Sequence, residues 1–254
     1  MAPKTREKHS NRSKPEAVAP LQVNWPPLRP LVPSLDLYID PILPNQIFLI
    51  RNFFTSSLCK NYVSFLSSSI PLTTTPARPK SKDEAVRVND RFQIQDAEFA
   101  ERLWSQTALR DLVSECRGLT DDEEDDLSDL QLRTWGGTPL GLNPNIRIYR
   151  YSPGQFFAQH YDDSNNIQFP EASTSSKAGS IAARTTWTLL IYLTTTEGGE
   201  TVFYPEDGAP PISVAPEVGM ALLHRHGEHC LLHDAKEVRK GEKWVIRSDL
   251  VVPR

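Results

Sequence analysis

The chain has 254 residues, of which 39% are hydrophobic and 24% charged, and its formal net charge is −4. This apolar content is enough for one large domain with a buried core, and the acidic balance argues against a general attraction to nucleic acid or anionic membranes. The three cysteines are scattered, with no C-x-x-C pair, which argues against a disulfide framework or a structural zinc cage and indicates a reducing compartment.

The first 34 residues predict a flexible, basic and proline-rich tail, followed by one folded domain over residues 35–254. The tail has too little apolar surface to offset the entropy cost of ordering. Five basic residues near its start could serve as a nuclear address or a docking arm, although a solvated tail is the simpler interpretation. They are Lys4, Arg6, Lys8, Arg12 and Lys14.

The N-terminus has no apolar run behind its basic residues, so it does not resemble a secretory signal. A run of about 18 apolar residues, as a membrane span requires, is also missing from the sequence. We therefore expect a soluble intracellular protein, in the cytoplasm or the nucleus, with no membrane contact.

Two helices are predicted in the first half of the folded region, after an apolar strand at residues 47–50. Thr55 is a suitable N-cap for the first helix, and Asp96 for the second. The apolar positions of the first are Leu58, Tyr62, Phe65 and Leu66, and those of the second are Phe99, Leu103, Trp104, Leu112, Val113 and Cys116. The acidic run at 121–126 repels itself and lacks apolar anchors, so it predicts an exposed loop.

After residue 143 the sequence changes to short β-rich runs separated by turn signals, which predicts an all-β sandwich or barrel. The runs are "NIRIYRY", "TTWTLLIYL", "TVFYP", "GMALLH", "HCLLH" and "KWVIRSDLVV". Between the first two lies "FPEASTSSKAGSIAAR", whose small and polar composition predicts a mobile loop that could act as a lid.

The stretch "QFFAQHYDDS" holds a candidate pair of metal ligands, His160 and Asp162. If this segment is a strand, residues two apart lie on the same face, so both side chains would point at one spot. Because H-x-D occurs by chance in many proteins, the pair alone does not establish a metal site, and a polar strand end is the simpler interpretation of it. A third ligand elsewhere in the chain is needed to decide.

Four histidines crowd the segment "HRHGEHCLLHDAKEVRKGEK". His224 and His233 each end an apolar strand, whereas His226 and His229 flank Gly227 in a predicted turn. A zinc hydrolase or a cupin isomerase could use such a cluster, but strand ends and turns explain most of these histidines without a metal.

The order of H-x-D, "GGETVFY" and His233 followed by "GEKWVIR" resembles the 2-oxoglutarate and Fe(II)-dependent dioxygenases of the prolyl 4-hydroxylase-like type, in a fungal branch. The likeness extends over residues 45–254 and is strongest near the C-terminus. It implies a mainly β fold with flanking helices around a double-stranded β-helix, or jelly-roll, core.

The resemblance also implies roles for particular residues. His160, Asp162 and His233 form the iron-binding triad, and Lys243 holds the far carboxylate of 2-oxoglutarate, with Arg247 as the competing candidate. Tyr151 and Thr201 contribute hydroxyls to the cosubstrate pocket, with Gly198 and Gly199 forming a turn. The implied cofactors are Fe(II), 2-oxoglutarate and O2, with ascorbate as a further candidate.

These residue types suit that chemistry. Two imidazoles and one carboxylate occupy one face of Fe(II) and leave three positions for a bidentate 2-oxo acid and O2. A buried cosubstrate carboxylate also needs a cation beside it.

Strand parity places Arg147, Tyr149 and Tyr151 on one face and Ile146 and Ile148 on the other.

The expected function is hydroxylation of a C–H bond in a peptidyl or small-molecule substrate, with release of succinate and CO2. The alternative is a non-catalytic jelly-roll that binds a ligand or partner. Asp249 stands where collagen-type prolyl hydroxylases carry tryptophan, which argues against proline as the substrate. The sequence "RSDLVVPR" does not match the R-x-N-x-T-x-R pattern of nucleic-acid demethylases, so nucleic acid is not an expected partner.

Five polar residues next to strands are further candidates for the mouth of the pocket, although turn caps and surface charges explain them equally well. They are Asn89, Asp90, Arg91, Asn143 and Arg147.

Overall fold

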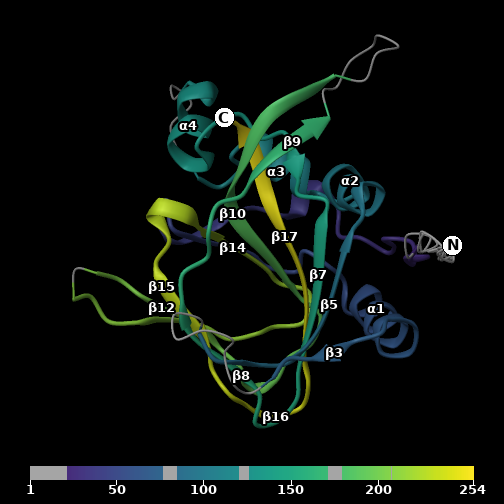
Figure 1. The fold of residues 1–254 in the computed structure, drawn as a ribbon. Helices are drawn as coiled ribbons and strands as arrows, with labels where there is room; N and C mark the ends of the chain where they lie inside the picture. Colours follow the sequence, from purple (N-terminus) through teal and green to yellow (C-terminus); the bar gives the residue numbers. More distant parts are fainter. Residues whose placement is uncertain (1–21, 77–84, 120–125, 171–178, 207) are drawn as a thin grey trace, which may run out of the picture.

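The computed structural model describes residues 22–76, 85–119, 126–170, 179–206 and 208–254 (Figure 1). Within these residues the chain forms a ten-stranded and a five-stranded antiparallel sheet, with a small two-stranded pair at one end. This arrangement is mainly β with flanking helices, as the sequence predicts.

The larger sheet has the strand order β1-β2-β14-β10-β17-β7-β5-β3, with β6 paired to β17 and β9 to β10. Its strands are β1 (Asp40–Leu43), β2 (Ile47–Ile50), β3 (Thr73–Thr74), β5 (Asp90–Gln95), β6 (Gly141–Leu142), β7 (Asn145–Tyr151), β9 (Asn166–Pro170), β10 (Ser180–Tyr192), β14 (Ala221–Arg225) and β17 (Lys243–Pro253). Neighbouring strands are mostly distant in sequence, which is typical of a jelly-roll.

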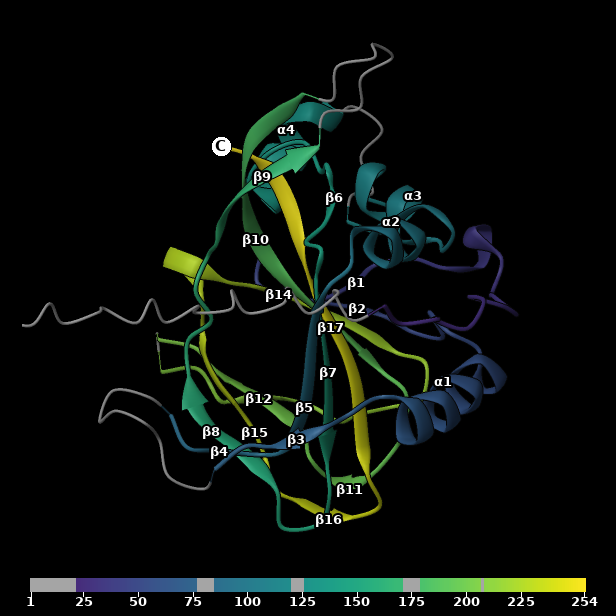
Figure 2. The same ribbon diagram turned by 45° about the vertical axis from the view of Figure 1, so that its right-hand side comes forward.

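The smaller sheet has the order β13-β12-β15-β8-β4. Its strands are β4 (Arg87–Val88), β8 (Phe156–His160), β12 (Thr201–Tyr204), β13 (Ile212–Val214) and β15 (Leu232–Ala235), and the separate pair is β11 (Glu197–Gly198) with β16 (Val238–Lys240). Figure 2 shows β8, β12 and β15 on one side of β7 and β17, and the helices α1, α2 and α3 on the other.

Helices cover the outer side of the larger sheet. They are α1 (Ser56–Ser69), α2 (Ala97–Ser105), α3 (Leu109–Ser114) and α4 (Leu127–Trp135), with short 3-10 turns η1 (Ser34–Asp36) and η2 (Gly227–His229). The apolar core between this sheet and the helices includes Phe48 and Trp187, whose rings stack at 4.7 Å. No helix in these described parts of the chain is both long and apolar enough to cross a membrane.

A second, smaller core lies between the two sheets, and strand alternation decides which side chains reach it. On β17, Trp244 and Ile246 belong to the outer core, whereas Val245 belongs to the core between the sheets. Lys243 and Arg247 share the parity of Val245. The same rule directs Tyr149 and Tyr151 of β7 inward, so the predicted faces of this strand are confirmed.

The first predicted helix is confirmed as α1, and Thr55 caps it by accepting a hydrogen bond from the Leu58 N–H at 3.2 Å. The second predicted helix is wrong in its length, because the structure has two helices, α2 and α3, in its place. Thr107 lies at the break, where its hydroxyl donates to the Leu103 carbonyl and accepts from the Leu109 N–H. A polar side chain that competes for backbone groups in this way interrupts the helix.

Replacing Thr55 with alanine is expected to destabilise the protein by about 1 kcal/mol, because the Leu58 N–H loses its side-chain acceptor. Urea denaturation measures this change, and Thr55→Ser, which keeps the hydroxyl, is the matched control. Equal stability of the alanine variant and the original chain would contradict the capping role.

Residues 22–34, which the sequence assigns to the flexible tail, lie against the helices in the structure. Trp25 stacks on Phe99 with ring centroids 4.0 Å apart, and its indole N–H donates to Asp96 at 2.7 Å. Leu28 is also buried. The difference arises because two large apolar residues anchor a proline-rich segment that loses little entropy on ordering. Residues 1–21, with Lys4, Arg6, Lys8, Arg12 and Lys14, lie outside the described part.

Two predicted loops overlap residues that the structure describes only in part. Residues 121–125 of the acidic run lie outside the described residues, and Asp126 caps α4, a helix that the sequence analysis did not predict. In the predicted lid, residues 171–178 lie outside the described ranges. The flanking residues do not form a loop, because β9 pairs with the start of β10 there.

Candidate metal and cosubstrate site

Three predicted ligands meet beside the paired strands β8 and β15 of the smaller sheet. His160 ends β8, Asp162 lies two residues beyond it, and His233 lies on β15, directly opposite His160 in the strand pairing. One ligand atom of each residue lies within 4.8 Å of those of the other two. The Asp162 carboxylate is 3.8 Å from the Nε2 atoms of both His160 and His233.

The two imidazoles are oriented by the backbone. The Nδ1 of His160 lies 2.8 Å from the Ala158 carbonyl, and that of His233 lies 2.9 Å from the Leu231 carbonyl. A carbonyl can only accept, so each Nδ1 carries the proton and each Nε2 keeps its lone pair. Metal-binding histidines are usually held in this way. Burial lowers the pKa of both rings, that of His160 to about 3, which favours the neutral, ligating form.

Arg247 contacts the carboxylate of Asp162. Its guanidinium nitrogens lie 3.2 Å from Oδ1 and 3.0 Å from Oδ2, and the Thr188 hydroxyl donates to Oδ2 at 3.0 Å. Burial alone would raise the pKa of Asp162, but Arg247 and the neighbouring histidines outweigh it and hold that pKa well below its usual range. The aspartate is therefore ionised at neutral pH.

A second buried carboxylate lies behind Arg247. Asp249 is fully buried, 3.5 Å from Arg247, and it accepts hydrogen bonds from Arg147 at 3.0 Å and Asn143 at 3.2 Å. With Asp162 the network holds two arginines and two aspartates, so its formal charges cancel. Asp249 is thus part of the support for Asp162.

Arg247→Ala is expected to destabilise the metal-free protein by about 3 to 5 kcal/mol, because Asp162 and Asp249 would stay buried with one partner fewer. Chemical denaturation measures the loss. The matched control is Arg239→Ala, whose side chain is 60% exposed beside Glu197 and which should change stability by less than about 0.5 kcal/mol. Similar stability of the two variants would contradict the role assigned to Arg247.

Lys243 is buried on the inner face of β17. Its Nζ donates to the Gly199 carbonyl at 2.7 Å and lies 3.5 Å from the Thr201 hydroxyl. The rings of Tyr151 and Tyr192 lie 5.5 and 5.3 Å from it. Among the described residues it makes no ion pair with a carboxylate, and burial lowers its pKa to about 7. An anionic ligand would supply the missing partner.

One cavity connects these groups. Its lining includes every predicted site residue: Tyr151, His160, Asp162, Thr201, His233, Lys243 and Arg247. Of the two candidate cations, Arg247 is engaged with Asp162, whereas Lys243 has no carboxylate partner.

The predicted glycine turn lies beside Lys243. Gly198 and Gly199 have φ of +79° and +76°, a conformation that glycine adopts readily. A Cβ on Gly199 would lie 2.9 Å from Val238 and 3.3 Å from the Lys243 side chain. The turn therefore depends on glycine at a point where the backbone approaches the lysine closely.

The residues near the cavity that were not assigned to the site by sequence include these four: Thr188, Tyr192, His224 and Cys230. Strand parity could have found three of them. His224 is two residues after the inward-facing Leu222 on β14, and Tyr192 and Thr188 share a face of β10. His224 Nε2 lies 3.7 Å from Asp162, and the Tyr192 hydroxyl is 2.8 Å from that of Thr201.

The other two histidines of the cluster lie farther out. His226 is buried and contacts the hydroxyls of Thr188 and Thr185 at 3.0 and 2.9 Å, so it reaches Asp162 only through Thr188. His229 is exposed on η2.

The five polar candidates for the pocket mouth do not line this cavity. Asp90 pairs with Arg150 at 2.8 Å, Asn89 bonds Thr75, and Arg91 donates to Gln93. Asn143 and Arg147 contact Asp249 instead, as described above. Each of the five is therefore engaged in local or supporting contacts.

Residues 146–248 match the family model of the 2OG-Fe(II) oxygenase superfamily. No curated protein matches the chain.

Among solved structures, the chain is similar to a prolyl hydroxylase from Trichoplax adhaerens, with 17% identity, 81% of this chain and 83% of that chain covered, and a TM-score of 0.52. A viral collagen prolyl hydroxylase from Paramecium Bursaria Chlorella virus-1 is 16% identical to this chain. The match covers 82% of this chain and 96% of the viral chain, with a TM-score of 0.49. A prolyl-4-hydroxylase from Pseudomonas putida is 14% identical to this chain. The match covers 82% of this chain and 93% of the bacterial chain, with a TM-score of 0.49.

The Trichoplax likeness confirms the predicted fold. The matched segment runs from β7 to β17 and contains all seven predicted site residues. Residues 146–248, which contain the candidate site, are therefore similar to the 2OG-Fe(II) oxygenase superfamily.

Proposed function

We propose that this protein is a dioxygenase that uses Fe(II), 2-oxoglutarate and O2 to hydroxylate a C–H bond of a peptidyl or small-molecule substrate. The observation that carries the proposal is a single cavity that contains both a two-histidine, one-aspartate donor set and a buried lysine with no carboxylate partner among the described residues. A non-catalytic binding jelly-roll has no need for both.

The donor set fits Fe(II). Two neutral imidazoles and one carboxylate are the ligands of non-haem Fe(II) oxygenases, and such a set leaves positions open for other ligands. His160 and His233 present unprotonated Nε2 atoms, and Asp162 is kept ionised by Arg247. These three residues would hold the metal. Bound there, Fe(II) supplies the activation of O2 that oxidises the cosubstrate and the C–H bond.

Lys243 would hold the far carboxylate of 2-oxoglutarate, because its ammonium group is the cation in this cavity that is not engaged with Asp162. Thr201 lies beside the same Nζ, and Tyr151 faces it from β7. Burial raises the pKa of Tyr151, so its hydroxyl stays protonated and can donate to a carboxylate. Arg247 would support Asp162 rather than the cosubstrate.

The reaction balances with one O2 consumed for each 2-oxoglutarate. One oxygen atom enters succinate, the other enters the new hydroxyl group of the substrate, and CO2 leaves. The buried setting of Lys243 would keep water from the cosubstrate and fix its orientation. The Trichoplax structure is described as a complex with a peptide fragment, which makes peptides the first substrate class to test.

The proposal is tested by anaerobic loading of the full chain with Fe(II) and 2-oxoglutarate, followed by addition of 18O2. We expect succinate that carries one labelled oxygen, and a higher rate when a peptide or metabolite pool contains the substrate. Binding of 2-oxoglutarate without any succinate, in the presence and absence of these pools, would instead support the binding module.

A further inference from the structure

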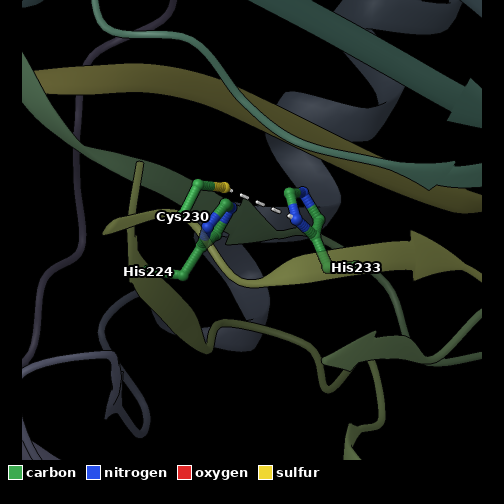
Figure 3. A group of neighbouring side chains, drawn as sticks. All are labelled: His224, Cys230 and His233. Atoms are coloured by element: carbon green, nitrogen blue, oxygen red, sulfur yellow. Dashed lines mark hydrogen bonds between the residues drawn. The ribbon is translucent and has the colours of Figure 1, made fainter. Parts of the chain in front are cut away.

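A second set of metal-ligating side chains lies beside the triad (Figure 3). It consists of His224 on β14, Cys230 after η2, and His233 on β15, and all three side chains are buried. One donor atom of each lies within 4.8 Å of the others. Figure 3 shows the three side chains converging from separate backbone segments.

The contacts within this set bring a sulfur atom against the histidines. The Cys230 sulfur lies 3.9 Å from Nδ1 of His233, and the rings of His224 and His233 have centroids 4.7 Å apart. The backbone N–H of Asp162 donates to the same sulfur at 3.2 Å. Burial raises the pKa of the Cys230 thiol to about 11, and the Asp162 N–H offsets this only in part, so it is a bound metal that would displace the thiol proton.

The two donor sets differ in chemical class. The triad offers two nitrogens and an oxygen, whereas the second set offers two nitrogens and a thiolate, which favours softer ions such as Zn²⁺. We propose that His224, Cys230 and His233 form a binding site for a thiophilic divalent cation of the Zn²⁺ class, and that occupation of this site excludes Fe(II) from the triad.

The exclusion follows from His233, which belongs to both sets. A neutral imidazole has one nitrogen with a free lone pair, so this ring can serve only one metal at a time. As the zinc–sulfur bond forms, the thiol proton passes to solvent, and no electrons are transferred. The exclusion of iron rests on the proposed function, whereas the thiolate site does not.

The first experiment is a Co²⁺ titration of the metal-free full chain, with Co²⁺ as the spectroscopic substitute for Zn²⁺. A near-ultraviolet sulfur-to-cobalt charge-transfer band is expected in the original chain and in His160→Ala, which lacks a triad ligand but keeps the second set. The band should be lost in Cys230→Ser and weakened in His224→Ala. The matched control is Cys116→Ser, which removes a buried thiol elsewhere in the chain and should keep the band.

Two outcomes would overturn the site: no sulfur band in His160→Ala, or a band of full intensity in Cys230→Ser. Circular dichroism and thermal melting establish that each variant is folded. If Cys230→Ser does not fold, the His224→Ala spectrum decides, because a band unchanged in intensity and position there also contradicts the ligand set.

The second experiment measures Zn²⁺ affinity and Fe(II) exclusion without turnover. Chelator competition should give a Zn²⁺ affinity more than about 100-fold weaker in Cys230→Ser than in Cys116→Ser. Mutating a residue that only hydrogen-bonds a metal ligand weakens metal binding by up to about 100-fold, and losing a ligand itself should weaken it more. Anaerobic Fe(II) uptake should then fall in proportion to the Zn²⁺ already bound. Simultaneous binding of one Zn²⁺ and one Fe(II) would refute the sharing of His233. Failure of 2-oxoglutarate turnover would leave these binding results unaffected.

Discussion

Replacing His233 with alanine is expected to abolish both iron retention and succinate formation while the fold survives. His233 lies opposite His160 in the strand pairing, and its Nε2 is 3.8 Å from the Asp162 carboxylate. Removal of one of three protein ligands should weaken Fe(II) binding by more than about 100-fold. This exceeds the loss of metal affinity that follows mutation of a residue that only hydrogen-bonds a ligand. Anaerobic Fe(II) titration and a succinate assay measure the two effects separately.

The same substitution separates the two donor sets. His160→Ala should also lose iron and turnover but keep the sulfur-to-cobalt band, whereas His233→Ala should lose the band as well, because only His233 belongs to both sets. His229→Ala is the matched control, since His229 is exposed on the same connection and should keep full iron binding. Normal succinate formation by His233→Ala would remove this residue from the proposed triad.

His226 tests how far the site extends beyond its ligands. It contacts Thr188, which in turn donates to Asp162, so His226→Ala should disturb the carboxylate only indirectly. We therefore expect measurable turnover to remain in this variant. Loss of iron equal to that of His233→Ala would place His226 among the ligands instead.

Strand periodicity accounts for much of what the sequence predicts correctly. On β17, residues two apart face the same way, so Lys243, Val245 and Arg247 could be assigned to one face before the structure was known. The same parity fixes Tyr149 and Tyr151 on β7. Local rules of this kind depend only on neighbours in sequence, which explains why they succeed for the cavity-lining strands.

The partners of the charged groups could not be predicted in the same way. Arg247 and Asp162 are 85 positions apart, and their ion pair depends on how β17 lies beneath the connection after β8. Asp249 was interpreted as a departure near the substrate, yet it is buried behind Arg247. The contacts of Asp162 with Arg247 and of Asp249 with Arg147 are both long-range, and sequence spacing gives no distance for such contacts.

His224 illustrates a different limit. As the last residue of an apolar run it was interpreted as a strand end, although it has the same parity as the inward-facing Leu222. Its closeness to Asp162 follows from the pairing of β14 with β10. The parity was available from the sequence, but the pairing partner was not. The order in residues 22–34 could not be predicted for the same reason. Trp25 anchors this segment because it stacks on Phe99 of α2, a contact between residues far apart in sequence.

Lys243→Ala is expected to weaken 2-oxoglutarate binding by roughly 30-fold to 150-fold, the equivalent of about 2 to 3 kcal/mol for a buried carboxylate that loses its charged partner. Arg247→Ala is expected to cost less in cosubstrate affinity, because Arg247 contacts Asp162 rather than the base of the cavity. Calorimetric titration of the metal-loaded, oxygen-free protein measures both. A steep loss in Arg247→Ala alone would make Arg247 the anchor and leave the proposed triad intact.

The affinity for 2-oxoglutarate should also depend on pH, in a direction fixed by Lys243. Burial lowers its pKa to about 7 in the ligand-free protein, so the lysine is charged below that pH and increasingly neutral above it. Because the carboxylate binds the charged form, binding above pH 7 requires uptake of a proton, and the dissociation constant should rise about tenfold per pH unit. Lys243→Arg stays charged throughout this range, so any binding that it retains should not vary with pH. A constant affinity of the original chain between about pH 7 and 9 would contradict the assignment of Lys243 as the anchor.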